Sequence, residues 1–79
     1  MSYLQEFKVV SRLETISAFN DDAISYLSMN LIDPFLAKVF NDKIRREMRL
    51  LRKIKAQKGH RYLKLAAVHS YLESILLAA

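Results

Sequence analysis

Apolar residues in the second half of the chain recur at steps of three or four positions, which is the spacing that gives a helix one apolar face. The clearest stripe consists of Leu36, Phe40, Ile44, Met48, Leu51 and Ile54. Asp33 and Pro34 mark its start, because Asp accepts hydrogen bonds from the first backbone amides and Pro at the first helical position gives up no hydrogen bond. Gly59 suits the left-handed residue that ends a helix. The pattern predicts a long helix over residues 34–57.

The segment after Arg61 carries a second stripe of this kind, which predicts a helix that continues to near the C-terminus. This stripe consists of Leu65, Val68, Leu72, Ile75 and Leu76. Leu63, Tyr71 and Leu77 fall outside it. The helix is therefore apolar on more than one side, and we expect it to pack against two neighbours, one of which can belong to a second subunit.

The first thirty residues carry start signals for two shorter helices. Residues 2–5 and 11–14 both match the capping box, in which a hydroxyl side chain is followed three positions later by Gln or Glu. We predict a first helix over residues 3–18, with an extended segment over residues 3–10 as the alternative. The Asn-Asp-Asp run that opens residues 20–30 supplies an N-cap candidate and two acids for a first turn, so we predict a second helix there.

Together these elements predict an all-α protein, a compact bundle of about four helices with a long third helix, as a single domain over residues 1–79. The chain is 52% hydrophobic, with one Gly, one Pro and no Cys, which is typical of an ordered domain. A domain this small buries only about 60% of the surface of its unfolded chain. No disulfide can compensate, because the chain has no cysteine. We therefore expect dimerisation to complete the core.

The formal net charge of +5 is unevenly distributed. Residues 1–40 hold three Lys or Arg and five Asp or Glu, whereas residues 41–79 hold ten and three. On a helical wheel of the long predicted helix, one sector collects Lys38, Arg45, Arg46, Arg49, Arg52 and Lys53. Only Asp42 interrupts this sector, so its positive charge is largely uncompensated. Beyond the helix the basic run continues with Lys58, Arg61 and Lys64.

This cationic sector predicts a phosphate-binding surface. The planar fork of Arg can hold two phosphate oxygens, and a stripe along about 24 residues is roughly 36 Å long, comparable to one turn of duplex DNA. We therefore predict a non-enzymatic protein that binds DNA or RNA through the phosphate backbone and acts as a dimeric regulator or accessory factor. The alternative is an adaptor or inhibitor that docks on an acidic partner protein.

Two further interpretations of the sector are an anionic membrane surface and a merely solvated face. The membrane is disfavoured because neighbouring segments also carry apolar stripes, which can cover the apolar face in a folded bundle. The sequence does not indicate sequence-specific DNA recognition either. A helix-turn-helix motif drawn through residues 23–38 would have Asp33 and Pro34 in its turn, without the usual Gly. Tyr62 and Tyr71 can stack on exposed bases, although aromatic residues at such spacings are more often core residues.

Groups for catalysis or for metal binding are scarce. His60 and His69 are the only histidines, no thiol is present, and neither a Gly-rich phosphate loop nor an HExxH pair occurs. His69 and Glu73 are four positions apart, but two ligands do not make a metal site. We expect no enzymatic activity, no cofactor and no bound metal.

Glu47 is the acid that the wheel places close to the apolar sector rather than among the cations. A buried carboxylate needs a partner. Lys43, one turn earlier, is the local candidate, and Arg61 or His69 from the last helix are the tertiary ones. We interpret Glu47 as a tie between helices or a residue at the boundary of the apolar sector, and not as a functional acid.

The start of the chain has no basic segment followed by a long apolar stretch. The longest apolar runs, such as residues 75–79, are too short to span a bilayer. The lack of cysteine is compatible with a reducing compartment. We therefore predict neither export nor membrane insertion, and a cytoplasmic location.

Overall fold

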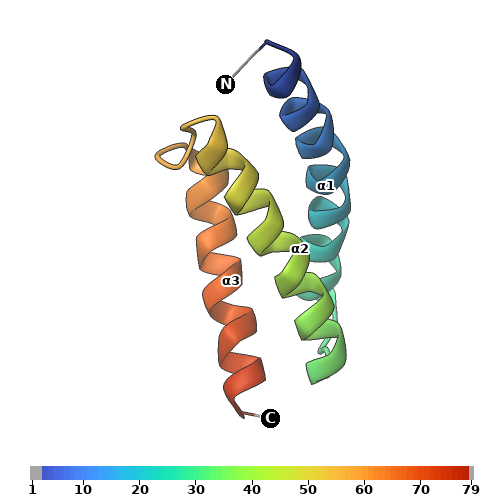
Figure 1. The fold of residues 1–79 in the computed structure, drawn as a ribbon. Helices are drawn as coiled ribbons and strands as arrows, with labels where there is room; N and C mark the ends of the chain where they lie inside the picture. Colours follow the sequence, from blue (N-terminus) through green and yellow to red (C-terminus); the bar gives the residue numbers. More distant parts are fainter. Residues whose placement is uncertain (1–2, 79) are drawn as a thin grey trace.

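Three helices make up the computed structural model, which describes residues 3–78. They are α1 (Tyr3–Met29), α2 (Pro34–Lys53) and α3 (His60–Ala78), and the described residues contain no strand. Each helix runs antiparallel to the one before it, and α2 lies between α1 and α3 (Figure 1). α2 packs against both neighbours, whereas α1 and α3 touch each other little. The predicted all-α class is confirmed, and the predicted count of four helices is wrong.

The two predicted N-terminal helices are one continuous helix of 27 residues, α1. Asn20 is buried in the middle of α1, where its side-chain amide donates to the Lys43 carbonyl oxygen at 3.2 Å and to Glu47 Oε1 at 2.9 Å. A helix cap would need Asn20 Oδ1 to accept from a backbone amide two or three residues further on, but this oxygen has no hydrogen-bond partner among the described residues and Asn20 lies within the continuous helix. Residues 3–10 are helical as well, so the extended alternative is wrong. Ser2, a predicted cap, lies outside the described residues.

The predicted start of α2 is confirmed. Asp33 Oδ1 accepts a hydrogen bond from the Leu36 amide at 2.8 Å, and Pro34 occupies the first helical position. The Asp33 carbonyl oxygen also accepts from the Ala37 amide at 3.0 Å, which closes the first turn. The chemistry of the cap and of the proline therefore sets this end of the helix.

The C-terminal end of α2 comes earlier than the predicted residue 57. The helix ends at Lys53, and Lys55 takes the left-handed conformation with a φ of 59°. The Lys55 amide donates to the Arg52 carbonyl oxygen at 3.0 Å, and the Ala56 amide donates to that of Leu51 at 2.9 Å. These two bonds are the Schellman pattern that closes a helix C-terminus.

Gly59 does not have the role that the sequence predicts for it, because no glycine among the described residues has a positive φ. It lies directly before α3, in the connection from α2. Its amide donates to the Ala56 carbonyl oxygen and its own carbonyl oxygen accepts from the Leu63 amide, both at 3.2 Å. Gly59 therefore helps to begin α3 rather than to end α2.

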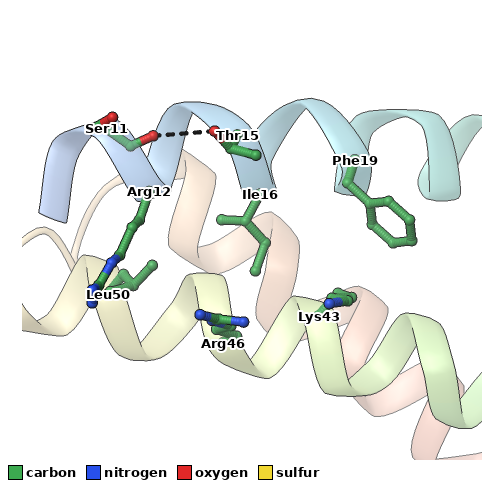
Figure 2. A pocket seen from close by; sticks show the side chains of 8 residues that line it. All are labelled: Ser11, Arg12, Thr15, Ile16, Phe19, Lys43, Arg46 and Leu50. Carbon is green, nitrogen blue, oxygen red and sulfur yellow. Dashed lines mark hydrogen bonds between the residues drawn. The ribbon is translucent and has the colours of Figure 1, made fainter. Parts of the chain in front are cut away.

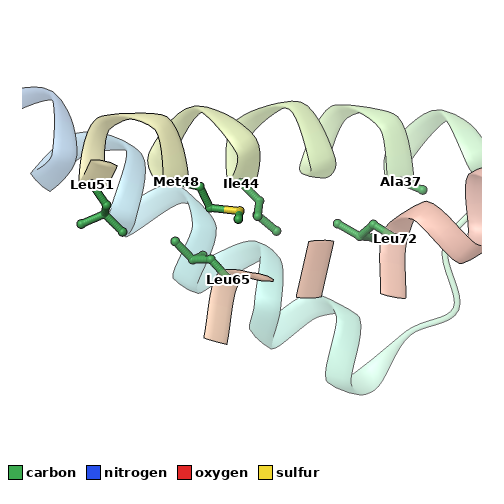
Figure 3. Packing of buried hydrophobic residues seen from close by; sticks show 6 residues of the cluster. All are labelled: Ala37, Ile44, Met48, Leu51, Leu65 and Leu72. Carbon is green, nitrogen blue, oxygen red and sulfur yellow. The ribbon is translucent and has the colours of Figure 1, made fainter. Parts of the chain in front are cut away.

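The core lies mainly between α2 and α3. Its buried residues are Ala37, Ile44, Met48 and Leu51 from α2 and Leu65 and Leu72 from α3 (Figure 3). A smaller cluster between α1 and α2 consists of Val9, Ile16 and Leu50, and Leu13 packs against both clusters. Because α2 contributes to both clusters, it is the helix that the fold holds most firmly in place.

Large apolar side chains remain exposed at both ends of the elongated molecule, whose principal extents are 42 × 19 × 19 Å. At the N-terminal end, α1 extends past the end of α2 (Figure 1), and Tyr3, Leu4 and Phe7 are exposed there. At the other end, Leu31 and Phe35 are exposed at the turn between α1 and α2. Over residues 3–78, none of the helices has the length and apolar character needed to cross a membrane.

Candidate polyanion-binding surface

The packing of α2 turns its basic residues outward. Ile44 and Leu51 hold one side of the helix in the core, so the positions about half a turn away face solvent. We call these exposed residues the α2 ridge, and its members are Lys38, Arg45, Arg46, Arg49, Arg52 and Lys53. The ion pairs found among residues 3–78 involve only Arg61 and His69 as cations. No ridge residue therefore forms an ion pair with a carboxylate of the described residues, and Asp42 is the one acid within the same sector of α2.

A cleft of about 120 Å³ lies on the side of the ridge that faces α3. Its lining consists of Arg45, Met48, Arg49, Arg52 and His69. Three guanidinium groups thus border one small space, and no carboxylate lines it. A phosphate group would relieve the repulsion among these charges, because a guanidinium donates to phosphate oxygens in a fixed fork.

Two contacts with α3 position the wall of this cleft. Arg52 Nη1 donates to the Tyr62 hydroxyl oxygen at 2.7 Å, and its guanidinium carbon lies 5.9 Å from the centre of the Tyr62 ring. His69 Nδ1 is 2.6 Å from Asn41 Oδ1, while Asn41 Nδ2 donates to Glu73 Oε1 at 3.0 Å. Because the Asn41 amide donates to Glu73, its oxygen is the acceptor for His69, which places the proton on Nδ1.

Glu73 is the carboxylate nearest to the histidine of the cleft, with its Oε1 at 3.9 Å from His69 Nε2. It sits one turn further along α3, and the same oxygen already accepts from Asn41. We predict from the sequence that this pair is a polar edge of the bundle and not a metal site. No group of three or more potential metal-binding His, Cys, Asp or Glu side chains occurs within residues 3–78.

A larger groove of about 350 Å³ lies on the other side of the ridge, between α2 and α1 (Figure 2). Its lining consists of Ser11, Arg12, Thr15, Ile16 and Phe19 from α1 and Lys43, Arg46 and Leu50 from α2. The prediction from the sequence does not identify Arg12, Ser11 or Thr15 as site residues. These residues belong to α1, and only the packing of α1 against α2 brings them beside the ridge. Arg12 is one of two cations on α1, the other being Lys8, and the sequence does not indicate which helix Arg12 faces.

Arg61, which the sequence places in the basic run, is directed into the interior. Its Nε donates to Glu47 Oε2 at 2.6 Å and its Nη2 to Glu47 Oε1 at 2.9 Å. Its Nη1 donates to Asp21 Oδ1 at 2.6 Å, and Nη2 also donates to the Ser17 carbonyl oxygen at 3.3 Å. The hydrogen bonds to Glu47, more than any other cause, raise the pKa of Arg61 above its ordinary value. This guanidinium is matched by two carboxylates and is not part of the ridge.

The prediction that Glu47 is a buried tie between helices is confirmed. Its side chain is 1% exposed, and its tertiary partner is Arg61. Lys43, the local candidate, forms no ion pair with it, and instead the Lys43 backbone carbonyl oxygen accepts from Asn20. The Asn20, Asp21, Glu47 and Arg61 side chains form what we call the interior network, which joins all three helices.

The remaining predicted residues lie away from the ridge. Lys58 is exposed in the connection between α2 and α3. Lys64 is exposed on α3 and does not line the cleft. Tyr62 is engaged by Arg52, and Tyr71 is exposed further along α3. The structure thus brings together the α2 residues of the prediction and separates those of α3.

Comparison of the chain with protein-family models, with curated proteins and with solved structures found no match.

Proposed function

We propose that this protein is a non-enzymatic nucleic-acid-binding protein that contacts the phosphate backbone through the α2 ridge, in a regulatory or accessory role. The observation that carries the proposal is the cleft in which Arg45, Arg49 and Arg52 lie side by side without a neutralising carboxylate. A solvated face that serves only solubility would be expected to mix charges of both signs. An unpaired row of guanidinium groups is instead complementary to a row of phosphates.

The dimensions of the ridge agree with such a partner. A helix of 20 residues is roughly 30 Å long, close to one turn of duplex DNA at about 34 Å. Arg45, Arg49 and Arg52 line the cleft on the side of α3, and Arg46 lines the groove on the side of α1, so contacts can follow a backbone that crosses the helix obliquely. Each neutralised phosphate releases counterions, so we expect the affinity to fall steeply with salt.

We also propose that the protein acts as a homodimer. The exposed residues Tyr3, Leu4 and Phe7 at one end and Leu31 and Phe35 at the other are apolar surface that a second copy can cover. Dimerisation would place two ridges on one particle and so increase the number of phosphate contacts. Sedimentation equilibrium over a hundredfold range of protein concentration tests this, and a constant monomer mass would contradict it.

A charge-reversal experiment tests the binding surface. We expect Arg45→Glu with Arg49→Glu to lower the affinity for a 20-base-pair duplex at low salt by about 100-fold or more, and to reduce the dependence of affinity on salt. The matched control is Lys58→Glu with Lys64→Glu, which reverses two charges away from the ridge and should cost much less. Equal losses in the two variants would show that net charge matters and that the ridge does not. If the protein binds no nucleic acid at low salt, an acidic partner protein becomes the better explanation of the ridge.

A further inference from the structure

The groove between α1 and α2 combines two kinds of surface that the ridge alone does not have. Its floor is apolar, with Ile16 and Leu50 buried and Phe19 40% exposed. Its rim is cationic, with Arg12 contributed by α1 and two cations contributed by α2. Figure 2 shows the Arg12 side chain reaching from α1 toward α2, with the Ile16 side chain between the helices.

We propose that this groove binds a single unpaired nucleotide unit, with its base on the apolar floor and its phosphate on the cationic rim. This inference rests on the proposed function and makes it more specific, because the preferred partners are then nucleic acids with unpaired, exposed bases. The ligand chemistry is a phosphate joined to a flat, largely apolar ring with a polar edge. That chemistry occurs in a single strand and in a free mononucleotide.

Charge complementarity argues for the phosphate. Arg12, Lys43 and Arg46 line one groove although they come from two helices, and none of them forms an ion pair within residues 3–78. No carboxylate lines the groove either. Like charges that line one groove without a counter-charge repel one another, so an anion bound in the groove is stabilised by them. Arg46 also belongs to the ridge, so a backbone that follows the ridge passes the mouth of the groove.

The floor and the hydroxyl groups argue for a base rather than for an acyl chain. The Phe19 ring contacts Phe40 edge to face, with centroids 6.2 Å apart and the ring planes at 74°, so its orientation is held from one side while it lines the groove on the other. Ser11 adds a hydroxyl that a base edge can use, and Thr15 Oγ1, which donates its proton to the Ser11 carbonyl oxygen at 3.3 Å, adds an acceptor. The volume of about 350 Å³ is within the range of roughly 300–1,000 Å³ for small-molecule sites.

A base that is stacked and paired in a duplex cannot enter this groove, because it must leave the stack first. The groove therefore predicts a preference for single strands, loops or bulges over continuous duplex. Contact of a base with an aromatic side chain contributes about 1–3 kcal/mol by alanine substitution, which is a difference of about 5-fold to 150-fold in affinity.

Filling the groove tests the inference. In the full chain, Thr15→Trp places an indole at the lining of the groove, and Ala18→Trp is the matched control because Ala18 is exposed on α1 and does not line the groove. The ligands are a 15-nucleotide oligothymidine, a 15-base-pair duplex and adenosine monophosphate, titrated by fluorescence anisotropy or calorimetry at low salt. We expect Thr15→Trp to weaken binding of the single strand by about 10-fold or more and to change duplex binding by less than about twofold.

A second variant avoids the risk that the indole disturbs the fold. Arg12→Gln removes a charge that belongs to the groove and not to the ridge, and Lys8→Gln is its control on the same helix. We expect Arg12→Gln to lower the affinity for the single strand more than the affinity for the duplex. Lys8→Gln should change both affinities equally. Circular dichroism checks that all variants keep their helix content.

The outcomes separate this inference from the proposed function. If duplex and single strand bind to wild type but neither groove variant changes their ratio, the groove inference is wrong and the proposed function stands. If only the mononucleotide binds, and Thr15→Trp abolishes it, the groove is confirmed for a free nucleotide and the proposed function is wrong. If none of the three ligands binds to wild type, both are wrong.

Discussion

Arginine side chains are paired with carboxylates in one region of this small protein, the interior network, and lack such partners in another, the α2 ridge. In the interior network, Arg61 donates to two carboxylates and to a backbone carbonyl oxygen. On the ridge, Arg45 and Arg49 have no carboxylate partner among residues 3–78. The same side chain therefore stabilises the fold in one region and remains available to an external anion in the other. Packing, and not residue type, decides which arginine is free.

The largest expected effect breaks the interior network. Glu47→Ala leaves the Arg61 guanidinium without its bidentate partner and the Asn20 amide without one of its acceptors. We expect the free energy of unfolding to fall by about 3 kcal/mol, measured by urea denaturation followed by circular dichroism. Combining it with Arg61→Met should cost less than the sum of the two single changes, because the partners are coupled. A loss below about 0.5 kcal/mol would place Glu47 with ordinary surface residues.

A smaller effect, of the opposite sign, is expected at the end of the ridge helix. Lys55 adopts a φ of 59° at the position that closes α2, and a left-handed backbone costs a residue with a Cβ roughly 1 kcal/mol more than it costs Gly. We expect Lys55→Gly to raise the free energy of unfolding by about 0.5–1 kcal/mol. Lys58→Gly is the control, because no positive φ is found there. Destabilisation by Lys55→Gly would mean that the charge of this side chain matters more than its backbone conformation.

The smallest expected effect on stability comes from the ridge itself. Arg45→Gln with Arg49→Gln removes two charges that have no partner, so we expect stability to change by less than about 0.5 kcal/mol, with any gain arising from reduced repulsion. Thermal unfolding at low and high salt checks this. The wild type should gain more from added salt than the variant, because salt screens the repulsion that the variant lacks. A loss comparable with that of Glu47→Ala would remove the distinction between the two regions.

Part of this arrangement could be predicted from the sequence because its causes are local. The start of α2 follows from the chemistry of Asp33 and Pro34, and the outward ridge follows from a helical period in which apolar and basic residues separate. The helical wheel also predicts that Glu47 lies near the apolar side of α2. Because a buried carboxylate needs a partner, Arg61 is among the residues that the sequence suggests for this pairing.

The rest depends on contacts between distant segments. Asn20 has the local signature of a helix start, yet its amide has acceptors 23 and 27 positions away, which the local pattern does not contain. Gly59 is the better left-handed residue by propensity, but Lys55 has that role, and Ala56, which follows it, packs against the core. The groove with Arg12 exists only once α1 lies against α2. Arg61 is another such case. The sequence places it in the basic run, whereas in the structure it pairs with Glu47 and Asp21 and does not belong to the ridge.

Arg61 lies on α3, and its guanidinium donates hydrogen bonds to Asp21 on α1 and to Glu47 on α2. Helices α1 and α3 otherwise have little direct contact, so without Arg61 the packing of α1 would depend almost entirely on α2. Detaching the second half of α1 would break the Asp21 and Asn20 contacts and admit water to a carboxylate that is now shielded. The backbone amides around Asn20 should therefore exchange their hydrogens as slowly as those of α3, while the amides near Phe7 exchange fast.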